Sequence, residues 1–370
     1  MILKTLMPAF LLPVILFGCN GQSYHANSSS ASTPAAIKAS PSNATGTATA
    51  KGSSTSFGGD KSKSAETTLK QAITNTKILT SKDLVASDTD TGKAKPEKME
   101  NLWVQLANNQ HFADNGAHPR IDRYLRRYTN NQAYFDRTMK RAFLYMPYIS
   151  AQIKERGLPA ELVLLPFIES AYNPFAYSSG GAAGLWQFMP STAKALGLTR
   201  SSWYDGRRDV IASTKAALTY LEYLHKRFDG DWLIALAAYN GGEGRLSRAI
   251  RENRSKGLKT DYWSLNLSKE TEAYIPHFLA LTRVITNTGT YGVNIPHLDN
   301  DINFSITKLE KPIDLQRAAK LAGIEVDTLY MLNPGLLRKA IPPSGSFNLI
   351  LPTRAATTLK ARSTSGPGTS

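Results

Sequence analysis

Residues that build disulfides, metal sites and nucleotide sites are scarce or badly spaced in this sequence of 370 residues. Cys19 is the single cysteine, so no disulfide can form within the chain. The six histidines are scattered without His-x-x-x-His spacing, and there is no Cys-x-x-Cys pair, so we predict no metal site. No glycine-rich loop leads into Lys followed by Ser or Thr, so nucleotide hydrolysis has no support. We therefore expect an activity that needs no cofactor.

Aromatic residues are nearly absent between Gln22 and about Lys98. Ser, Thr, Ala, Gly and Lys dominate this stretch, as in "HANSSSASTPAAIKASPSNATGTATAKGSSTSFGGDKSKS". Such a segment cannot bury enough apolar surface to offset the entropy lost on ordering. The sequence therefore predicts a disordered tether over residues 19–97.

The extreme N-terminus, "MILKTLMPAFLLPVILFGCN", has one lysine followed by a short apolar stretch. The stretch is too short to span a membrane comfortably and is typical of an export signal, which we place at residues 1–18. Leu16-Phe17-Gly18-Cys19 resembles a bacterial lipobox, which implies lipidation of Cys19 after cleavage. Asn20 follows in place of aspartate, which favours the periplasmic face of the outer membrane. The alternative is an ordinary signal peptide that happens to contain a cysteine.

Acidic residues are outnumbered: 29 Asp and Glu stand against 44 Lys and Arg, a formal charge of +15. Basic proteins can bind nucleic acid, anionic lipid or acidic polymers. The sequence has neither an RNA-binding aromatic signature nor zinc-finger spacing, so we predict no nucleic-acid partner. The charge fits an anionic cell envelope or a solvated surface.

From about Asn101 the hydrophobic pattern becomes helical. The apolar residues of one helix recur at spacings of three and four: Phe135, Met139, Ala142, Met146, Ile149 and Ile153. Gly157 ends this helix, and Pro159 suits the first turn of the next, "AELVLLPFIES", which is apolar nearly all round and should be buried. Pro166 is expected to kink that buried helix. Further helices are predicted over 211–228, 231–240 and 268–285, and strand signals are sparse until about Asn303, so the fold class is mainly α.

Glu169 ends this buried helical run and opens "ESAYNPFAYSSGGAAGLWQFMP". A carboxyl group at the edge of an apolar core is desolvated, which raises its pKa and allows it to act as a general acid near neutral pH. A lone glutamate more often caps or pairs at a helix end, but its neighbours favour chemistry. They supply short polar groups, flat aromatic faces and flexible backbone, as sugar sites do: Ser170, Asn173, Ser178 and Gln187; Trp186 and Phe188; Gly180, Gly181 and Gly184.

The order Glu-Ser, Asn-Pro, Ser, Gly-Ala-x-Gly-Leu-x-Gln resembles the signature of family 1 lytic transglycosylases, which share the goose-type lysozyme fold. "WYDGRRDV", "FDGDWLIALAAYNGGEGRLSRAI" and "TDYWSLNLSKETEAYIPHFLAL" extend the resemblance over roughly residues 101–290. It implies that Glu169 is the single catalytic acid. It also implies these substrate-contacting residues: Ser178, Trp186, Gln187, Tyr239, Asn240 and Tyr274. Among them, Tyr274 is expected to approach the catalytic carboxyl, although core packing of that tyrosine is an equal alternative.

No second acid lies close to Glu169 in sequence, whereas most glycoside hydrolases need two. Lytic transglycosylases use the C6 hydroxyl of the substrate as the nucleophile, so one acid suffices and the product carries a 1,6-anhydromuramic end. Asp205 and Asp209 are interpreted as a turn residue and a helix cap, with ion pairing to Arg207 or Arg208. A hydrolysing muramidase on the same fold and a non-catalytic peptidoglycan-binding protein remain open as alternatives.

The C-terminal sequence resembles a LysM peptidoglycan-binding module. Leucines and alanines such as Leu315, Ala318 and Leu329 fit its helical face, and "LNP" fits its helix end, but "EKPID" replaces the usual Gly-Asp-Thr turn. The module is expected either to bind glycan or to pack against the catalytic domain as a degenerate copy. The predicted organisation is a lysozyme-like domain at 98–298, this small α/β module at 299–355 and a disordered tail at 356–370. We expect a monomer whose partners are peptidoglycan strands and, through the anchor, a membrane.

Overall fold

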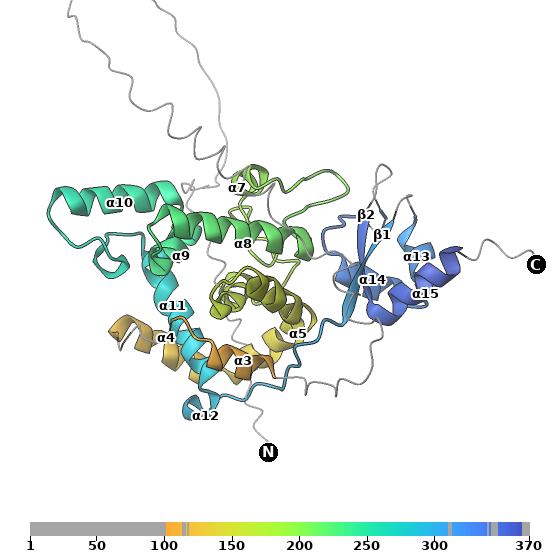
Figure 1. Ribbon diagram of the computed structural model, residues 1–370, viewed down its shortest axis with the longest axis horizontal. Helices are drawn as coiled ribbons and strands as arrows, with labels where there is room; N and C mark the ends of the chain where they lie inside the picture. The colour runs from red at the N-terminus through yellow and green to blue at the C-terminus, as the bar shows by residue number, and fades with distance from the viewer. Residues whose placement is uncertain are drawn as a thin grey trace, which may run out of the picture.

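The computed structural model describes residues 101–112, 116, 118–309, 313–338, 340–341 and 347–364. The predicted export signal, tether and lipidated Cys19 lie outside these ranges. A helical body carries α10 at one end and a small α/β module at the other (Figure 1). Within the described ranges, none of the helices combines the length and the apolar character that crossing a bilayer requires.

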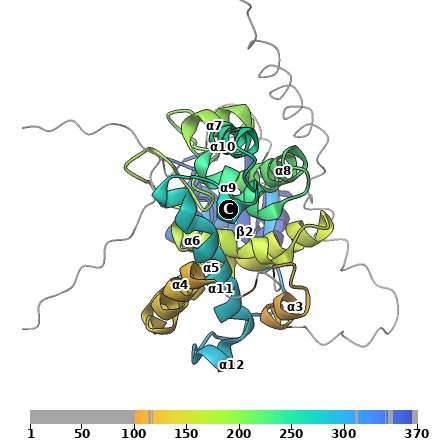
Figure 2. The same cartoon turned by 90° about the vertical axis from the view of Figure 1, so that its left-hand side faces the viewer.

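The body is built from helices, as the hydrophobic periodicity predicts. They are α3 (Leu102–Asn108), α4 (Pro119–Thr129), α5 (Gln132–Glu155), the 3-10 helix η2 (Ala160–Leu164), α6 (Leu165–Ser170), α7 (Pro190–Ala195), α8 (Val210–Arg227), α9 (Trp232–Gly241), α10 (Glu243–Ser255), the 3-10 helix η3 (Tyr262–Ser264), α11 (Lys269–Thr286) and α12 (Thr288–Tyr291). Several begin at a side chain that accepts a hydrogen bond from a first-turn N–H, including Asp209 for α8, Asp231 for α9 and Ser268 for α11. In both cartoon views α11 runs beside α4 (Figures 1 and 2).

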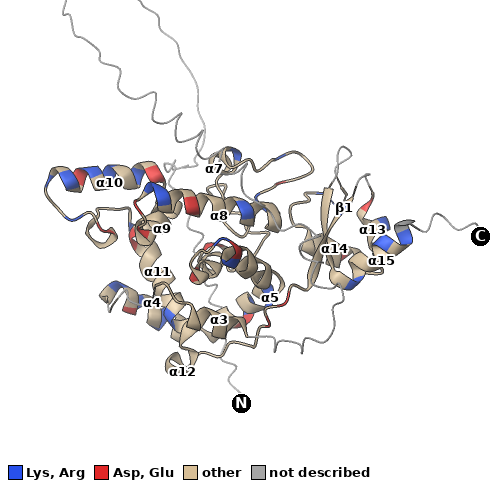
Figure 3. Cartoon of the chain, viewed as in Figure 1, with Lys and Arg blue, Asp and Glu red and all other residues tan. Residues whose placement is uncertain are grey.

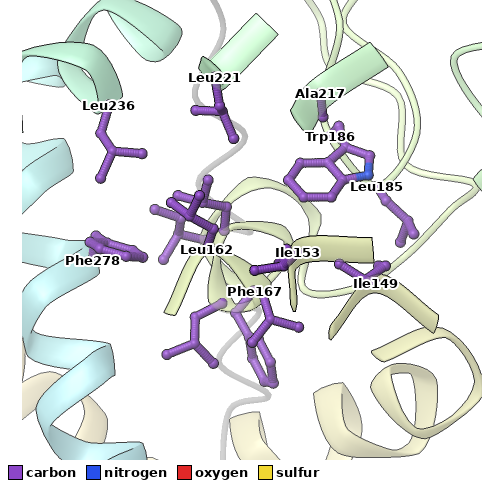
Figure 4. Packing of buried hydrophobic residues seen from close by; sticks show 14 of the residues in the cluster. Ile149, Ile153, Leu162, Phe167, Leu185, Trp186, Ala217, Leu221, Leu236 and Phe278 are labelled. Atoms are coloured by element: carbon purple, nitrogen blue, oxygen red, sulfur yellow. The ribbon is translucent and has the colours of Figure 1, made fainter. Parts of the chain in front are cut away.

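The short run η2–α6 occupies the centre of the hydrophobic core. Leu162 and Phe167 are almost fully buried, and Figure 4 shows them surrounded by side chains from α5, α8, α9 and α11. Burial of a large apolar side chain stabilises a fold by about 1.5–3 kcal/mol, so this packing fixes the position of the residue that ends α6. The run predicted as one helix kinked at Pro166 is divided just before that residue into the 3-10 helix η2 and the α-helix α6. Proline lies in the first turn of α6, where its missing N–H has no partner to lose.

The C-terminal module pairs two strands and covers them with helices. Strands β1 (Phe304–Leu309) and β2 (Phe347–Pro352) are antiparallel, with Phe304 opposite Pro352. Three helices complete the module: α13 (Leu315–Ala322), α14 (Val326–Leu332) and α15 (Thr353–Thr364). This arrangement confirms the expected small α/β unit beside a mainly α body.

Sequence composition misled the prediction of the tail. A disordered tail was expected from residue 356, yet α15 extends to Thr364. Ala355, Ala356 and Leu359 lie on its buried face, and only 3% of the Leu359 surface is exposed. The threonines and charged residues around these positions hid the apolar face of the helix from an argument based on composition.

Candidate active site

Glu169 is held at the last turn of α6, directly before a sharp change in chain direction. Ala171 and Tyr172 follow with φ of 49° and 56°, a left-handed conformation that costs non-glycine residues of the order of 1–3 kcal/mol each. The Ser170 hydroxyl donates to the carbonyl of Leu185 at 2.9 Å, and Tyr172 donates to the carbonyl of Val163 at 2.8 Å. The first bond joins the end of α6 to the glycine-rich loop, the second joins the turn to η2, and together they support the strained backbone.

A small pocket opens above Glu169. Its lining comes from α6, the glycine-rich loop, α7, α8, α9 and α11: Glu169, Ala182, Gln187, Phe188, Met189, Thr192, Tyr220, Tyr239, Asn240 and Glu270. Three of the predicted site residues, Gln187, Tyr239 and Asn240, therefore meet Glu169 in one place. The pocket combines aromatic faces with amide and carboxyl groups, a composition suited to sugar rings and their N-acetyl groups.

The carboxyl group of Glu169 is desolvated, and no Lys, Arg or His of the described residues forms an ion pair with it. Burial raises its pKa from the usual 4.5 to about 7, against the opposing effect of a hydrogen bond from Tyr274, and the negative charge of Glu270 raises it further. The Tyr274 hydroxyl donates to Glu169 Oε1 at 2.5 Å. Burial and the nearby Glu169 raise the pKa of Tyr274 well above its ordinary value, so this hydroxyl stays protonated and acts as the donor. A carboxyl group of this pKa can give and take a proton near neutral pH.

Gln187 and Tyr239 shape the pocket through bonds to backbone. Gln187 has φ of 48°, and its Nε2 donates to the carbonyl of Gly184 at 2.8 Å. The Tyr239 hydroxyl donates to the carbonyl of Trp186 at 2.8 Å, and burial together with the charge of Glu169 raises the pKa of this tyrosine well above its ordinary value. Phe188 lies beside the Tyr239 ring, with 6.1 Å between centroids.

Two predicted contact residues lie away from the pocket. Trp186 is completely buried, and its Nε1 donates to Thr214 Oγ1 at 3.1 Å, so its side chain belongs to the hydrophobic core rather than to the lining of the pocket. An aromatic residue beside a glycine-rich turn can face either way, and here it faces the core (Figure 4). Ser178 is also buried, and its hydroxyl accepts from the Ala182 N–H at 2.9 Å, which closes the loop on itself.

Glu270 is a second carboxyl group in the pocket, and the sequence argument missed it. It belongs to the first turn of α11, where an acid is expected simply as helix-start chemistry. Burial raises its pKa, while a hydrogen bond from Asn240 and the charge of Arg245 lower it. Only the packing of α11 against α9 brings this distant residue beside Glu169.

A buried ion pair stabilises the glycine-rich loop 181–188, which lines one side of the pocket. Arg207 is completely buried and contacts Asp205 through Nη2 at 2.7 Å and Nε at 3.0 Å. Its Nη1 donates to the carbonyls of Gly181 at 2.6 Å and Phe188 at 3.2 Å, on both arms of the glycine-rich loop. Burial alone would raise the pKa of Asp205, but the hydrogen bonds and charge of Arg207 outweigh it and hold that pKa below its usual value. The predicted pairing of Asp205 is thus confirmed, as is the capping of α8 by Asp209.

Gly184 packs so closely against the backbone of Arg207 that only glycine fits at this position. Its φ is 83°, and an added Cβ would lie 1.9 Å from the carbonyl oxygen of Arg207. No side chain can be accommodated there, so the glycine serves backbone approach between two protein segments rather than approach to a ligand.

Charged side chains elsewhere do not converge on the pocket to form a metal site. In the described ranges no three His, Cys, Asp or Glu residues gather closely enough to hold an ion. Basic residues are spread over α4, α10 and α15 (Figure 3).

Comparison with known proteins identifies two domains. Residues 146–262 match the family described as "Transglycosylase SLT domain", and residues 303–367 match "Lytic transglycosylase MltD, LysM-like domain". The first match contains Glu169, Gln187 and Tyr239. The second extends through α15, in agreement with the corrected end of the module.

Individual relatives agree with these domains. The chain is 42% identical over 247 residues to membrane-bound lytic murein transglycosylase D of Escherichia coli (strain K12), covering 67% of this chain and 55% of that protein. It is 55% identical over 116 residues to a protein named for tributyltin chloride resistance in Alteromonas sp. (strain M-1), covering 31% and 56%. The chain thus spans little more than half the length of these relatives.

Among solved structures, the 70 kDa soluble lytic transglycosylase of Escherichia coli aligns with a TM-score of 0.34 and 17% identity. The alignment covers 62% of this chain and 44% of that one. Similarity this low supports no conclusion about the pocket.

Proposed function

Since this chain belongs to the lytic transglycosylase family through its SLT domain and its LysM-like domain, we propose that it is a peptidoglycan lytic transglycosylase. The bond cut is the β-1,4 linkage between MurNAc and GlcNAc, and the product end is 1,6-anhydro-MurNAc. The observation that carries the proposal is Glu169, a desolvated carboxyl group with a pKa of about 7 in a pocket lined by aromatic and amide groups.

The proposed reaction uses one carboxyl group twice. Glu169 donates its proton to the glycosidic oxygen as that oxygen leaves C1 of MurNAc. The carboxylate that remains then accepts the proton of the C6 hydroxyl of the same sugar, whose oxygen forms the new bond to C1. Glu169 regains its proton, and no water is consumed. Tyr274 holds Oε1 and leaves Oε2 for the transfer.

A hydrolysing muramidase is the second candidate, and Glu270 is the observation that favours it. Glu270 lines the same pocket as Glu169. Most glycoside hydrolases use two carboxyl groups, one as the acid and one as the base that activates water. In the transglycosylase mechanism Glu270 contributes only its charge. In the hydrolase mechanism it would be indispensable.

Product analysis separates these candidates. Purified protein is incubated with purified peptidoglycan, and the released muropeptides are weighed by mass spectrometry. Anhydro products, one water lighter than reducing-end products, support the transglycosylase. Reducing muramic ends, together with loss of activity in Glu270→Gln, would support the hydrolase. Binding without cleavage would leave only the non-catalytic alternative.

We further propose that the protein acts as a monomer at the periplasmic face of the outer membrane, anchored through lipidated Cys19, in remodelling or turnover of the wall. A flexible tether would raise the local concentration of the enzyme near the polymer. Cys19→Ser should release the protein from membranes without changing its activity on soluble fragments. Recovery of the unsubstituted protein in the soluble fraction would rule out the anchor.

A further inference from the structure

We propose that the LysM-like module is a positioning element of the catalytic pocket. In this role the module holds the segment 203–209, and that segment holds the glycine-rich loop 181–188, which forms one wall of the pocket. The proposal rests on the proposed function for its activity readouts, but its structural readout is independent of catalysis.

The first link joins the module to the segment 203–209. The Leu337 N–H donates to the carbonyl of Trp203 at 2.8 Å, and the Asp205 N–H donates to the carbonyl of Gly335 at 2.8 Å. Leu336, between the two module residues, is completely buried and forms a β-bridge with Tyr204. Backbone bonds in both directions align the two segments like a short sheet.

The fit at this link is tight. A Cβ added to Gly335 would lie 2.9 Å from a ring carbon of Tyr204 and 3.1 Å from Cβ of Asp209. The Tyr204 hydroxyl in turn donates to Asp209 Oδ2 at 2.9 Å, and Asp209 caps α8. Any shift of the module at Gly335 therefore pushes on the segment that carries Asp205 and Arg207.

The second link passes from that segment to the loop. Arg207, held by Asp205, donates to the carbonyls of Gly181 and Phe188. Gly184 packs directly on the Arg207 carbonyl. Arg207 therefore contacts the loop near both of its ends, at Gly181 and Phe188, and at its centre, at Gly184.

The third link is the loop itself. Ala182, Gln187 and Phe188 line the pocket beside Glu169. The desolvation that raises the pKa of Glu169 depends on this wall excluding water. A looser loop would admit water to the carboxyl group and lower its pKa.

A second contact between the module and the catalytic domain supports the same coupling. The ring of Phe175 lies 5.9 Å from that of Tyr330 in α14 of the module, measured between centroids. The guanidinium of Arg208 lies 4.9 Å from the Phe175 ring centroid. The module therefore reaches the stretch that follows Glu169 as well as the segment 203–209.

The decisive test is amide hydrogen exchange in the full chain. Gly335→Ala should raise exchange several-fold at Ala183 and Phe188, whose N–H groups bond each other's carbonyls at 3.2 Å. The matched control is Leu359→Val, which weakens the module core away from the interface. It should lower the melting temperature comparably but leave loop exchange unchanged. Tyr145→Phe, which removes only the hydroxyl that donates to the Met331 carbonyl at 3.1 Å, should cause a smaller rise and covers the case in which Gly335→Ala fails to fold.

Activity adds a second readout. With a loosened loop, the high-pH limb of the rate profile should move to lower pH in Gly335→Ala but not in Leu359→Val. Unchanged loop exchange in Gly335→Ala, or an equal rise in the control, would overturn the positioning role even if the enzyme is active. Altered exchange in a protein without any cleavage activity would support positioning while rejecting the proposed function.

Discussion

Glu169 and Asp205 are two desolvated carboxyl groups with opposite pKa shifts: Asp205 is buried, whereas Glu169 is half-buried at the pocket. Asp205 is contacted by Arg207 at 2.7 Å, and its pKa lies below the usual value. Glu169 has a tyrosine and a second carboxyl as neighbours, and its pKa lies at about 7. Arg207 holds Asp205 in its ionised form, whereas Glu169, which has no ion-pair partner among the described residues, keeps a transferable proton near neutral pH.

The two carboxyl groups therefore have different roles: Asp205 stabilises the fold around the pocket, and Glu169 is the proposed proton donor and acceptor. The Asp205–Arg207 pair holds the loop on which the pocket depends, and it has no proton to exchange at neutral pH. Among the described residues Glu169 has no ion-pair partner, and it lies directly before the strained residues Ala171 and Tyr172. Ionisation of this desolvated carboxyl group therefore costs free energy. The proposed reactive carboxyl group, Glu169, thus lacks a neutralising cation among the described residues. Asp205, which Arg207 neutralises, holds the glycine-rich loop in place.

The largest expected effect comes from Glu169→Gln. The amide keeps the shape but cannot transfer a proton, so the cleavage rate should fall by roughly 10²–10⁴-fold. The assay is release of muropeptides from purified peptidoglycan. Full activity of this variant would reject Glu169 as the acid.

The same variant should gain stability in a pH-dependent way. The pKa of Glu169 is higher in the folded chain than in the unfolded chain, so ionisation destabilises the fold as pH rises from about 4.5 to about 7. Above that window wild type loses up to about 3 kcal/mol, which Glu169→Gln does not lose. Thermal melts should show a larger advantage of the variant at pH 8 than at pH 5.

Removal of the Arg207 guanidinium tests whether the buried ion pair with Asp205 stabilises the fold. Arg207→Met removes the buried cation beside Asp205 and leaves that carboxyl only the exposed Arg200 as an ion-pair partner. It also removes the side-chain hydrogen bonds to the carbonyls of Gly181 and Phe188, so we expect a loss of about 3–5 kcal/mol in the free energy of unfolding. Denaturant titration measures this directly. The control is Arg200→Met, since Arg200 pairs with Asp205 at 3.3 Å from an exposed position and should contribute at most about 1 kcal/mol. Equal losses in both variants would contradict a special role for the buried pair.

The smallest effects should be opposite shifts of the pH profile. Tyr274→Phe removes the hydrogen bond that lowers the pKa of Glu169, so the high-pH limb should move to higher pH. Glu270→Gln removes the negative charge that raises the same pKa, so the limb should move to lower pH. Shifts in the same direction would mean that these neighbours act on the rate through something other than the charge state of Glu169.

The local sequence was sufficient to predict the environment of a residue when its partners lie close to it in the chain. Glu169 follows an apolar run that must be buried, and Asp205 stands two residues before Arg207, so both environments could be predicted. Glu270 could not, because its place in the pocket depends on how α11 packs on α9. The orientation of Trp186 and the buried face of α15 were missed for a related reason: each depends on a core that only tertiary packing defines.

The most direct test of the contrast is a titration of the Glu169 carboxyl by ¹³C NMR in the full chain, with Glu169→Gln used to assign its resonance. We predict that this resonance titrates near pH 7. The Asp205 carboxyl should titrate below the usual pKa of aspartate, because Arg207 stabilises its ionised form. A Glu169 resonance that titrates near its ordinary value of 4.5 would contradict the claim that the pocket keeps this carboxyl protonated for catalysis.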